Sequence, residues 1–270
     1  MRPVASCPMD ELTIILLAAG RSTRFGRPKQ LEPIGHAGET IPELTLRDAF
    51  ASCCTRAIII SSPEHEQHFR KLSDGDARIE VHCQPQALGT AHAAWIGIQR
   101  CNGPVIIANG DDLYGLRSMQ LACTQALLPH GEDHALIAFP LAHTLSANGP
   151  VNRAICRLDE NRMLSSTTEV TGLSRSPEGV IHDEDGVVRA EDEPVSMNLW
   201  MMRPAMKPYF VKALEQRAMQ AECGLPTVVL AAVRAGQRFR CIATLDHWLG
   251  LTFAADADLV RAQLLRGHAT

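Results

Sequence analysis

The sequence predicts an α/β fold with a three-layer, Rossmann-like sheet that is mostly parallel. In the first half of the chain, apolar runs of four to eight residues alternate with helical patterns, which is typical of parallel strands covered by helices on both faces. Polar, glycine-containing turns follow the first and fourth of these runs, where an open sheet of this kind binds ligands. The 270 residues suffice for one large α/β domain or two small ones.

The individual elements follow from local patterns. Thr40, Pro42 and Glu43 carry the cap, first-turn proline and capping-box signals of a helix start. Ser62-Pro63-Glu64 is expected to open another helix. The expected strands are 12–18, 56–61, 79–83, 104–109, 134–141, 154–158, 195–202, 238–244 and 248–252, and the expected helices are 40–53, 62–72, 89–100, 116–128, 205–220, 227–235 and 257–265. Residues 164–173 alternate and are polar, and the acidic segment 174–193 is expected to be a long loop or flap, or else a surface insertion.

Composition and charge exclude several classes of protein. Hydrophobic content of 46% with 21% charged residues suits a globular protein and argues against disorder. A formal net charge of -4 gives no general attraction to nucleic acid or to an anionic membrane. No apolar run approaches the roughly 20 residues that span a bilayer, and residues 1–10 make a poor signal peptide. Nine cysteines without CxxC spacing fit a reducing compartment, so we expect a cytoplasmic protein that binds neither nucleic acid nor membrane.

The first motif is the loop after the apolar run Leu12–Leu17. It contains Gly20 and Gly26, three arginines and Lys29. Glycines let the backbone approach a bulky anion, and the cations neutralise phosphate charge. The spacing fits neither the Walker loop nor the dinucleotide G-x-G-x-x-G motif. We expect a triphosphate site here; the alternative is a plain turn with solvated cations.

The second motif is the string Gln84 to Ala93, between an expected strand and an expected helix. A glutamine amide can pair with the edge of a base as donor and acceptor. Gly89 is expected to leave room for a flat ring against the backbone, and Thr90 to cap the helix that follows. The alternative is a loop with a helix cap and no ligand.

The third motif is Asn109-Gly110-Asp111-Asp112, at the end of an apolar strand. Adjacent carboxylates at such a turn suit Mg²⁺ held by one or two carboxylates and by substrate phosphates. Asp111 is the expected ligand, and Asp112 could support it from behind. Because aspartate-rich turns are common, this prediction depends on the other two motifs.

Together the motifs identify a resemblance. The pattern L-A-A-G-x-x-x-R-F-G-x-P-K over residues 17–29 resembles the opening of the nucleotidyltransferases that make nucleotide sugars. The pattern Q-x-x-x-L-G-T-x-H-A over residues 84–93 is similar to that of the N-acetylglucosamine-1-phosphate uridylyltransferases. The resemblance implies a single nucleotidyltransferase domain over residues 1–270. Its nucleotide-binding half would span about 10–145 and its acceptor-binding half about 146–270.

The resemblance also implies site residues. Arg24 and Lys29 would contact the triphosphate and the reacting phosphates, and Asp111 would bind Mg²⁺. The implied nucleotide-binding positions are Leu17, Ala18, Ala19, Gly20, Gln84, Gly89, Thr90 and Gly110.

The acceptor side departs from the family pattern. Asn198 and Glu169 match positions that contact the sugar. Ala154 stands where relatives have the glycine of a Tyr-Gly or Gly-Tyr-Gly turn near the sugar, and Ala154 and the adjacent Arg153 are the other expected acceptor-binding residues. Gly250 stands where relatives have a second metal-binding aspartate. Of the candidates to replace that ligand, Asp256 is preferred; Asp246, or water and substrate phosphate, are the others.

The expected reaction is the Mg²⁺-dependent transfer of a nucleotidyl group from an NTP, with a pyrimidine favoured, to a phosphorylated acceptor. A sugar 1-phosphate is the first choice of acceptor, and the products would be an NDP-linked compound and pyrophosphate. Two alternatives remain: a cytidylyltransferase for a small non-sugar phosphate or phosphonate, and a non-catalytic, regulatory nucleotide-binding module. An exposed apolar helix face could support a homo-oligomer.

Overall fold

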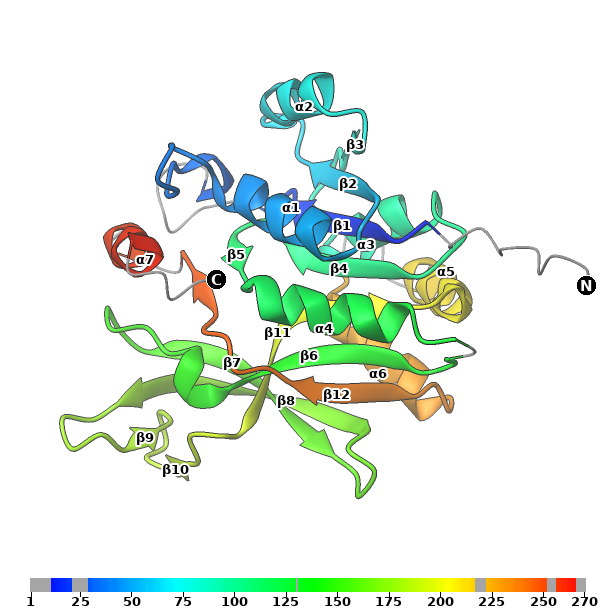
Figure 1. Ribbon diagram of the computed structural model, residues 1–270. Coiled ribbons are helices and arrows are strands. Elements are labelled where there is room, and N and C mark those ends of the chain that lie inside the picture. Colours follow the sequence, from blue (N-terminus) through cyan, green and yellow to red (C-terminus); the bar gives the residue numbers. More distant parts are fainter. Residues whose placement is uncertain (1–10, 21–28, 130, 217–221, 252–255, 266–270) are drawn as a thin grey trace, which may run out of the picture.

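Parallel strands form the centre of the sheet. In the computed structural model, β1 (Thr13–Ala18) lies between β2 (Arg56–Ser61) and β4 (Val105–Asn109), and β3 (Ile79–Cys83) pairs with the far side of β2. The order of the strands reverses at β1, and such sheets bind ligands at the carboxyl ends of the strands on either side of this point, here β1 and β4. Figure 1 shows β1 and β4 side by side. The structure describes residues 11–20, 29–129, 131–216, 222–251 and 256–265.

The antiparallel strand β11 (Pro194–Met202) joins the two halves of the chain. On one side it pairs with β6 (His134–Pro140), which also pairs in parallel with β12 (Phe239–Ala243). On its other side it pairs first with β7 (Val151–Leu158) and then with β4. Its register shifts between Ser196 and Trp200, where the strand leaves β7 and reaches β4.

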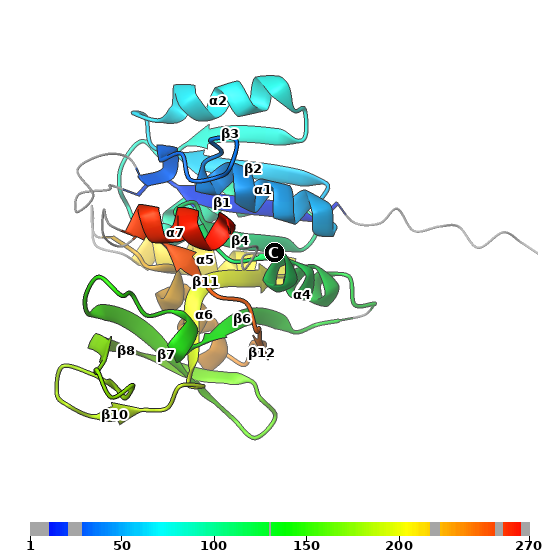
Figure 2. The same cartoon turned by 60° about the vertical axis from the view of Figure 1, so that its left-hand side comes forward.

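The acidic segment 174–193 is ordered strand and turn, so the expectation of a long loop or flap is wrong. β8 (Leu164–Arg175) pairs with β7, and β9 (Ile181–His182) and β10 (Val188–Arg189) extend the edge. Buried Asp183 holds the turn between β9 and β10: its carboxylate accepts from the Val187 N–H at 2.9 Å and from the Arg189 guanidinium at 2.6 Å. Figure 2 shows β8 and β10 at the opposite end of the molecule from β3.

Helices cover both faces of the sheet, which confirms the expected α/β architecture. In Figure 1, α1 and α4 lie in front of it and α3, α5 and α6 lie behind, each set over its own apolar cluster. The helices are α1 (Ile41–Ser52), α2 (Glu66–Gly75), α3 (Thr90–Ile98), α4 (Leu116–Ala126), α5 (Lys207–Gln216), α6 (Leu225–Arg234) and α7 (Asp256–Leu265), with 3-10 turns η1 (Lys29–Leu31), η2 (Leu141–His143) and η3 (Pro204–Met206). α7 contacts β13 (Leu249–Gly250), which pairs with β5 (Asp112–Leu113).

Local signals predicted most helix starts. The capping box of Thr40 and Glu43 is present at α1, as predicted. α2 begins at Glu66 rather than near Ser62, and the Ser62 hydroxyl lies 3.0 Å from the His65 ring nitrogen Nδ1 instead. β7 begins at Val151, before the predicted Ala154. The expected end of the helix over 205–220 falls outside the described residues.

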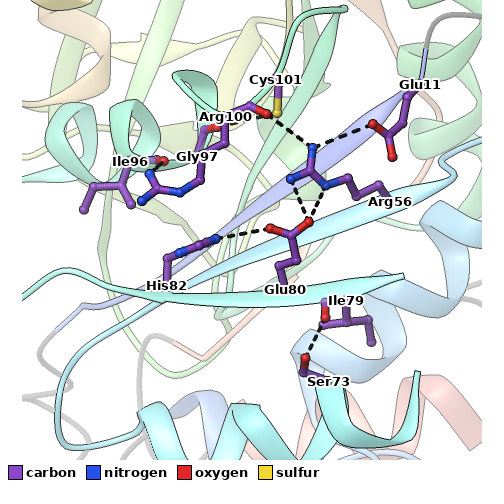
Figure 3. A network of polar contacts seen from close by, with 10 residues as sticks. All are labelled: Glu11, Arg56, Ser73, Ile79, Glu80, His82, Ile96, Gly97, Arg100 and Cys101. Atoms are coloured by element: carbon purple, nitrogen blue, oxygen red, sulfur yellow. Dashed lines mark hydrogen bonds and ion pairs between the residues drawn. The ribbon is translucent and has the colours of Figure 1, made fainter. Parts of the chain in front are cut away.

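Ion pairs join β2 and β3 at one edge of the parallel part of the sheet. Arg56, the first residue of β2, bonds to Glu80 of β3 at 2.7 Å and lies 3.7 Å from Glu11 (Figure 3). The same guanidinium donates to the carbonyl oxygen of Arg100 at 3.3 Å, and His82 reaches the other oxygen of Glu80. This network ties the first residue of β2 to β3, to Glu11 ahead of β1 and to the chain after α3. Among the described residues, no helix is both long and apolar enough to cross a membrane.

Candidate functional site

A cavity of about 570 Å³ lies at the carboxyl ends of β1 and β4. Its walls come from the end of β1, the segment before α3, the turn after β4, the bulge of β11 and the segment before α6. The residues that line it are Leu17, Ala19, Gly20, Gln30, Gln84, Ala87, Gly89, Thr90, Ala93, Asn109, Asp111, Asn198, Glu222 and Gly224. The cavity therefore joins residues of all three sequence motifs with one predicted acceptor contact, Asn198.

The end of β1 forms one wall. The side-chain amide of Gln30, which is buried, donates to the carbonyl oxygen of Gly20 at 3.4 Å. Gly110 donates its N–H to Leu17 at 2.9 Å, and a Cβ on Gly110 would lie 2.8 Å from that of Ala18. Gly110 is thus required for the close approach of β4 to β1, and Ala18 is fully buried beneath the cavity. Arg24 lies outside the described residues.

The segment from Gln84 to Gly89 forms the opposite wall. The Gln84 side-chain nitrogen lies 3.1 Å from the Gly89 carbonyl oxygen and 3.0 Å from Nδ1 of His92. Gly89 has a φ of +89°, which only glycine adopts readily, and a Cβ there would collide with the backbone of Cys223. Cys223 thus supplies a further reason for this glycine. Gly89 also lines the cavity, and the contact of a flat ring with its backbone stays a prediction.

Thr90 caps a different helix from the one predicted. α3 begins after Gly89 without a side-chain cap, whereas Oγ1 of Thr90 accepts from the N–H of Leu225 at 2.8 Å. Leu225 is the first residue of α6, so its N–H has no partner within its own helix. The contact, together with the pairing of Cys223 to Leu88 and Ala91 (2.9 Å each), joins the start of α6 to the wall of the cavity.

The aspartates after β4 have different environments. Asp111 is half-buried and lines the cavity, whereas Asp112 is buried and accepts from Nδ2 of Asn109 at 2.8 Å. Burial, reinforced by the charge of Asp111, raises the pKa of Asp112 to about 7. Burial also raises the pKa of Asp111, while the ammonium of Lys29 opposes that rise. Asp112 therefore supports the turn, and Asp111 presents its carboxylate to a ligand near Lys29.

Asn198 enters the cavity from the bulge of β11. Its φ of +62° is unusual for a residue with a side chain, although asparagine tolerates it better than most. Oδ1 accepts from the indole N–H of Trp200 at 3.2 Å. The NH₂ group of Asn198 has no partner among the residues that the structure describes and can donate to a ligand. The bulge thus places a hydrogen-bond donor beside Asp111 at the end of β4.

The donor set around Asp111 suits Mg²⁺. Asn109 uses its NH₂ group on Asp112, so its carbonyl oxygen, like the carboxylate of Asp111, is left as an oxygen ligand. Mg²⁺ binds to one or two such groups and takes its other ligands from water and substrate phosphates. Within the described residues, no group of three or more His, Cys, Asp or Glu side chains could hold a metal ion, so substrate would have to complete the site.

The other predicted acceptor residues do not line this cavity. Ala154 of β7 pairs with Glu169 of β8, and Glu169 is exposed. The buried Arg153 guanidinium donates to the carbonyl oxygen of Thr144 at 2.9 Å and stacks 4.8 Å from the centre of the Trp248 ring. These contacts hold Arg153 against Thr144 and Trp248, and it is not among the residues that line the cavity.

Asp256 and Gly250 line a second cavity, of about 260 Å³, beside α7. The carboxylate of Asp256 accepts from Ser146 at 3.1 Å and from Asn148 at 2.7 Å. At Gly250, a Cβ would collide with the indole of Trp248 and lie 2.9 Å from Asp112. The indole thus occupies the space that an aspartate side chain would need at this position.

Reasoning from the sequence missed several residues of the cavity. Gln30 and Asn109 adjoin predicted residues and could have been found by extending the motifs. Glu222 and Gly224 carry no local signal, because only the backbone pairing of Cys223 brings them to the cavity.

Comparison with known proteins decides the family. The model of the MobA-like NTP transferase domain matches residues 14–164, more than half of the chain. The chain belongs to this family. It is therefore a nucleotidyltransferase. A search of curated proteins found no match.

Solved structures share the fold of this NTP transferase. The inositol-1-phosphate CTP transferase from T. maritima has a TM-score of 0.69 and 14% identity, over 97% of this chain and 99% of that one. A putative glucose-1-phosphate thymidylyltransferase from Bacillus anthracis has a TM-score of 0.68 and 13% identity, over 94% and 95%. The likeness thus extends through both halves of the chain.

Proposed function

We propose that this NTP transferase joins the nucleotidyl group of a pyrimidine NTP to a sugar 1-phosphate, with Mg²⁺, and releases pyrophosphate. The observation that carries the proposal is the single cavity in which Gly20, Gln84, Asp111 and Asn198 meet. These residues come from four different segments of the chain. A phosphate region, a base region, a metal ligand and an acceptor contact in one cavity are what the reaction requires.

The two walls of the cavity divide the nucleotide between them. The triphosphate would lie at Gly20, Lys29 and Asp111, where the backbone can approach closely and the charge of Lys29 acts. Arg24 would contact the same phosphates. The base would lie along the segment from Gln84 to Thr90, at the start of α3.

The chemistry needs no covalent intermediate. An oxygen of the acceptor's phosphate would attack the α-phosphorus in line as the bond to pyrophosphate breaks. Catalysis is then alignment and charge stabilisation. Lys29 would neutralise the reacting phosphates, and the NH₂ group of Asn198 would orient the acceptor. Mg²⁺, held by Asp111 and the nucleotide, would supply further positive charge at the phosphates.

The choice of acceptor rests on what the structural neighbours are named for. Both are named for a phosphorylated ring compound, an inositol 1-phosphate and a glucose 1-phosphate. Glu169 and Ala154, paired across β7 and β8, remain predicted acceptor contacts, and so does Arg153.

Pyrophosphate release tests the proposal. The full chain with Mg²⁺ would be assayed with each NTP against sugar 1-phosphates, small non-sugar phosphates and phosphonates. We expect release with a pyrimidine NTP and a sugar 1-phosphate. Asp111→Asn should remove the Mg²⁺-dependent turnover, and Asp185→Asn, on an exposed turn, is the matched control. Release only with non-sugar acceptors would replace the sugar phosphate, and NTP binding without release from any pair would favour a regulatory module.

A further inference from the structure

The wall of the cavity beside Gly89 offers hydrogen-bond acceptors. The two N–H groups of the Gln84 amide point to the Gly89 carbonyl oxygen and to Nδ1 of His92, at 3.1 and 3.0 Å. Because a carbonyl oxygen can only accept, the Gly89 contact fixes which end of the amide is nitrogen. Gln84 itself is 5% exposed. Its oxygen Oε1 has no donor among the residues that the structure describes, and this atom is what the side chain can still offer to a ligand.

A second acceptor, Glu222, lines the same cavity. Its neighbour Cys223 pairs through its backbone with Leu88 and Ala91, so Glu222 is held at the Gly89 side. The side chain is exposed, and within the described ranges its carboxylate has no hydrogen bond or ion pair. An ionised carboxylate only accepts hydrogen bonds. Glu222 and Gln84 therefore both present oxygen atoms to whatever lies against this wall.

We propose that Gln84 and Glu222 select a base with an exocyclic amino group, and that the nucleotide is CTP. This inference rests on the proposed function and names its NTP. The amino group of cytosine has two N–H donors, one for Oε1 of Gln84 and one for the carboxylate of Glu222. Uracil and thymine carry a carbonyl oxygen at the same ring position. Their N3–H could still donate to one of the two acceptors, but the carbonyl oxygen would face the other without a donor, so one hydrogen bond would be lost.

The fixed orientation of the Gln84 amide distinguishes this wall from a base site with a freely turning glutamine. A free glutamine amide could turn to suit either pyrimidine, because it has both a donor and an acceptor end. Here the Gly89 carbonyl oxygen and His92 engage the donor end, so Gln84 offers a base an acceptor only. Glu222 adds a second acceptor on the same wall, which the amino group of cytosine can serve and the carbonyl oxygen of uracil cannot. A buried group left without its partner is what gives large discrimination between related ligands.

Titration calorimetry on the full chain would test the inference, with Mg²⁺ and without acceptor so that no turnover occurs. We expect CTP to bind about 10- to 100-fold more tightly than UTP, as for a hydrogen bond to a charged group. Glu222→Gln offers uracil an N–H, so CTP should weaken, UTP should improve and the ratio should fall about tenfold. Glu215→Gln, which makes the same charge change on the exposed side of α5, should leave the ratio unchanged.

The possible contrary results distinguish a failure of the inference from a failure of the proposed function. Equal binding of CTP and UTP, tighter binding of UTP, or an unchanged ratio in Glu222→Gln would overturn the inference and leave the proposed function standing. Tighter binding of ATP or GTP would overturn the inference together with the pyrimidine preference of the proposed function. Absence of binding by every NTP would overturn the proposed function, and this inference with it. Because Glu222 is exposed, its substitution should not disturb folding, which thermal unfolding of the variant would verify.

Discussion

The hydroxyl oxygen of Thr90, in the first turn of α3, accepts a hydrogen bond from the backbone N–H of Leu225, the first residue of α6, at 2.8 Å. The two residues are far apart in the chain, yet the contact satisfies a helix-terminal N–H that would otherwise lack a partner. It also fixes the start of α6 against the wall that carries Gly89 and Glu222.

Thr90→Val should therefore affect both stability and nucleotide binding. Loss of a capping hydroxyl costs about 0.5–2 kcal/mol, so the midpoint of urea unfolding should fall and NTP affinity should weaken. Thr90→Ser keeps the hydroxyl and should behave like the parent chain in both measurements. If Thr90→Val matched the parent in unfolding and in NTP affinity, the contact would have no importance for the cavity.

Lys29 is expected to act on the phosphates and on Asp111. Lys29→Ala should lower kcat about 10²- to 10³-fold with the fold retained, since one preorganised charge contributes about that much. Lys29 opposes the burial that raises the pKa of Asp111. Without it, this pKa rises further, so the acid limb of the pH–rate profile should move to higher pH. Lys212→Ala, exposed on α5, is the control, and a Lys29→Ala turnover close to that of the parent would remove Lys29 from the site.

Asn198 combines an unusual backbone with a ligand contact. At a φ of +62°, Asn198→Ala should be less stable than Asn198→Gly by about 1–2 kcal/mol, although both lose the bond to Trp200. Both variants should raise KM for the acceptor about tenfold without raising KM for the NTP. Urea unfolding and steady-state kinetics measure the two effects. An unchanged acceptor KM would show that Asn198 does not contact the acceptor.

The features that could be predicted from the sequence are those that depend on residues close together in the chain. The parallel strands, the capping box at Thr40 and the placement of Gln84 and Asp111 at strand ends follow from residues close together in the chain. The function of Gly89 and the place of Glu222 depend on Cys223, which is distant in sequence and meets the segment only through its backbone. A contact made only through the backbone leaves no pattern of side chains from which it could be predicted. The same holds for the turn of β9 and β10, where one buried aspartate orders an acidic, weakly patterned segment.

Trp248 packs so closely on Gly250 that an aspartate side chain does not fit at residue 250. A Cβ at residue 250 would collide with the indole, so Gly250→Ala should lower the free energy of unfolding by about 1–3 kcal/mol. In a Trp248→Ala background the same change should cost little, and a double-mutant cycle by urea unfolding gives the coupling. Additive effects would mean that the indole does not restrict the position. A coupling of more than about 1 kcal/mol would show that a side chain at residue 250 fits only when Trp248 is lost. A carboxylate at residue 250 would then also remove the ring that packs against Arg153.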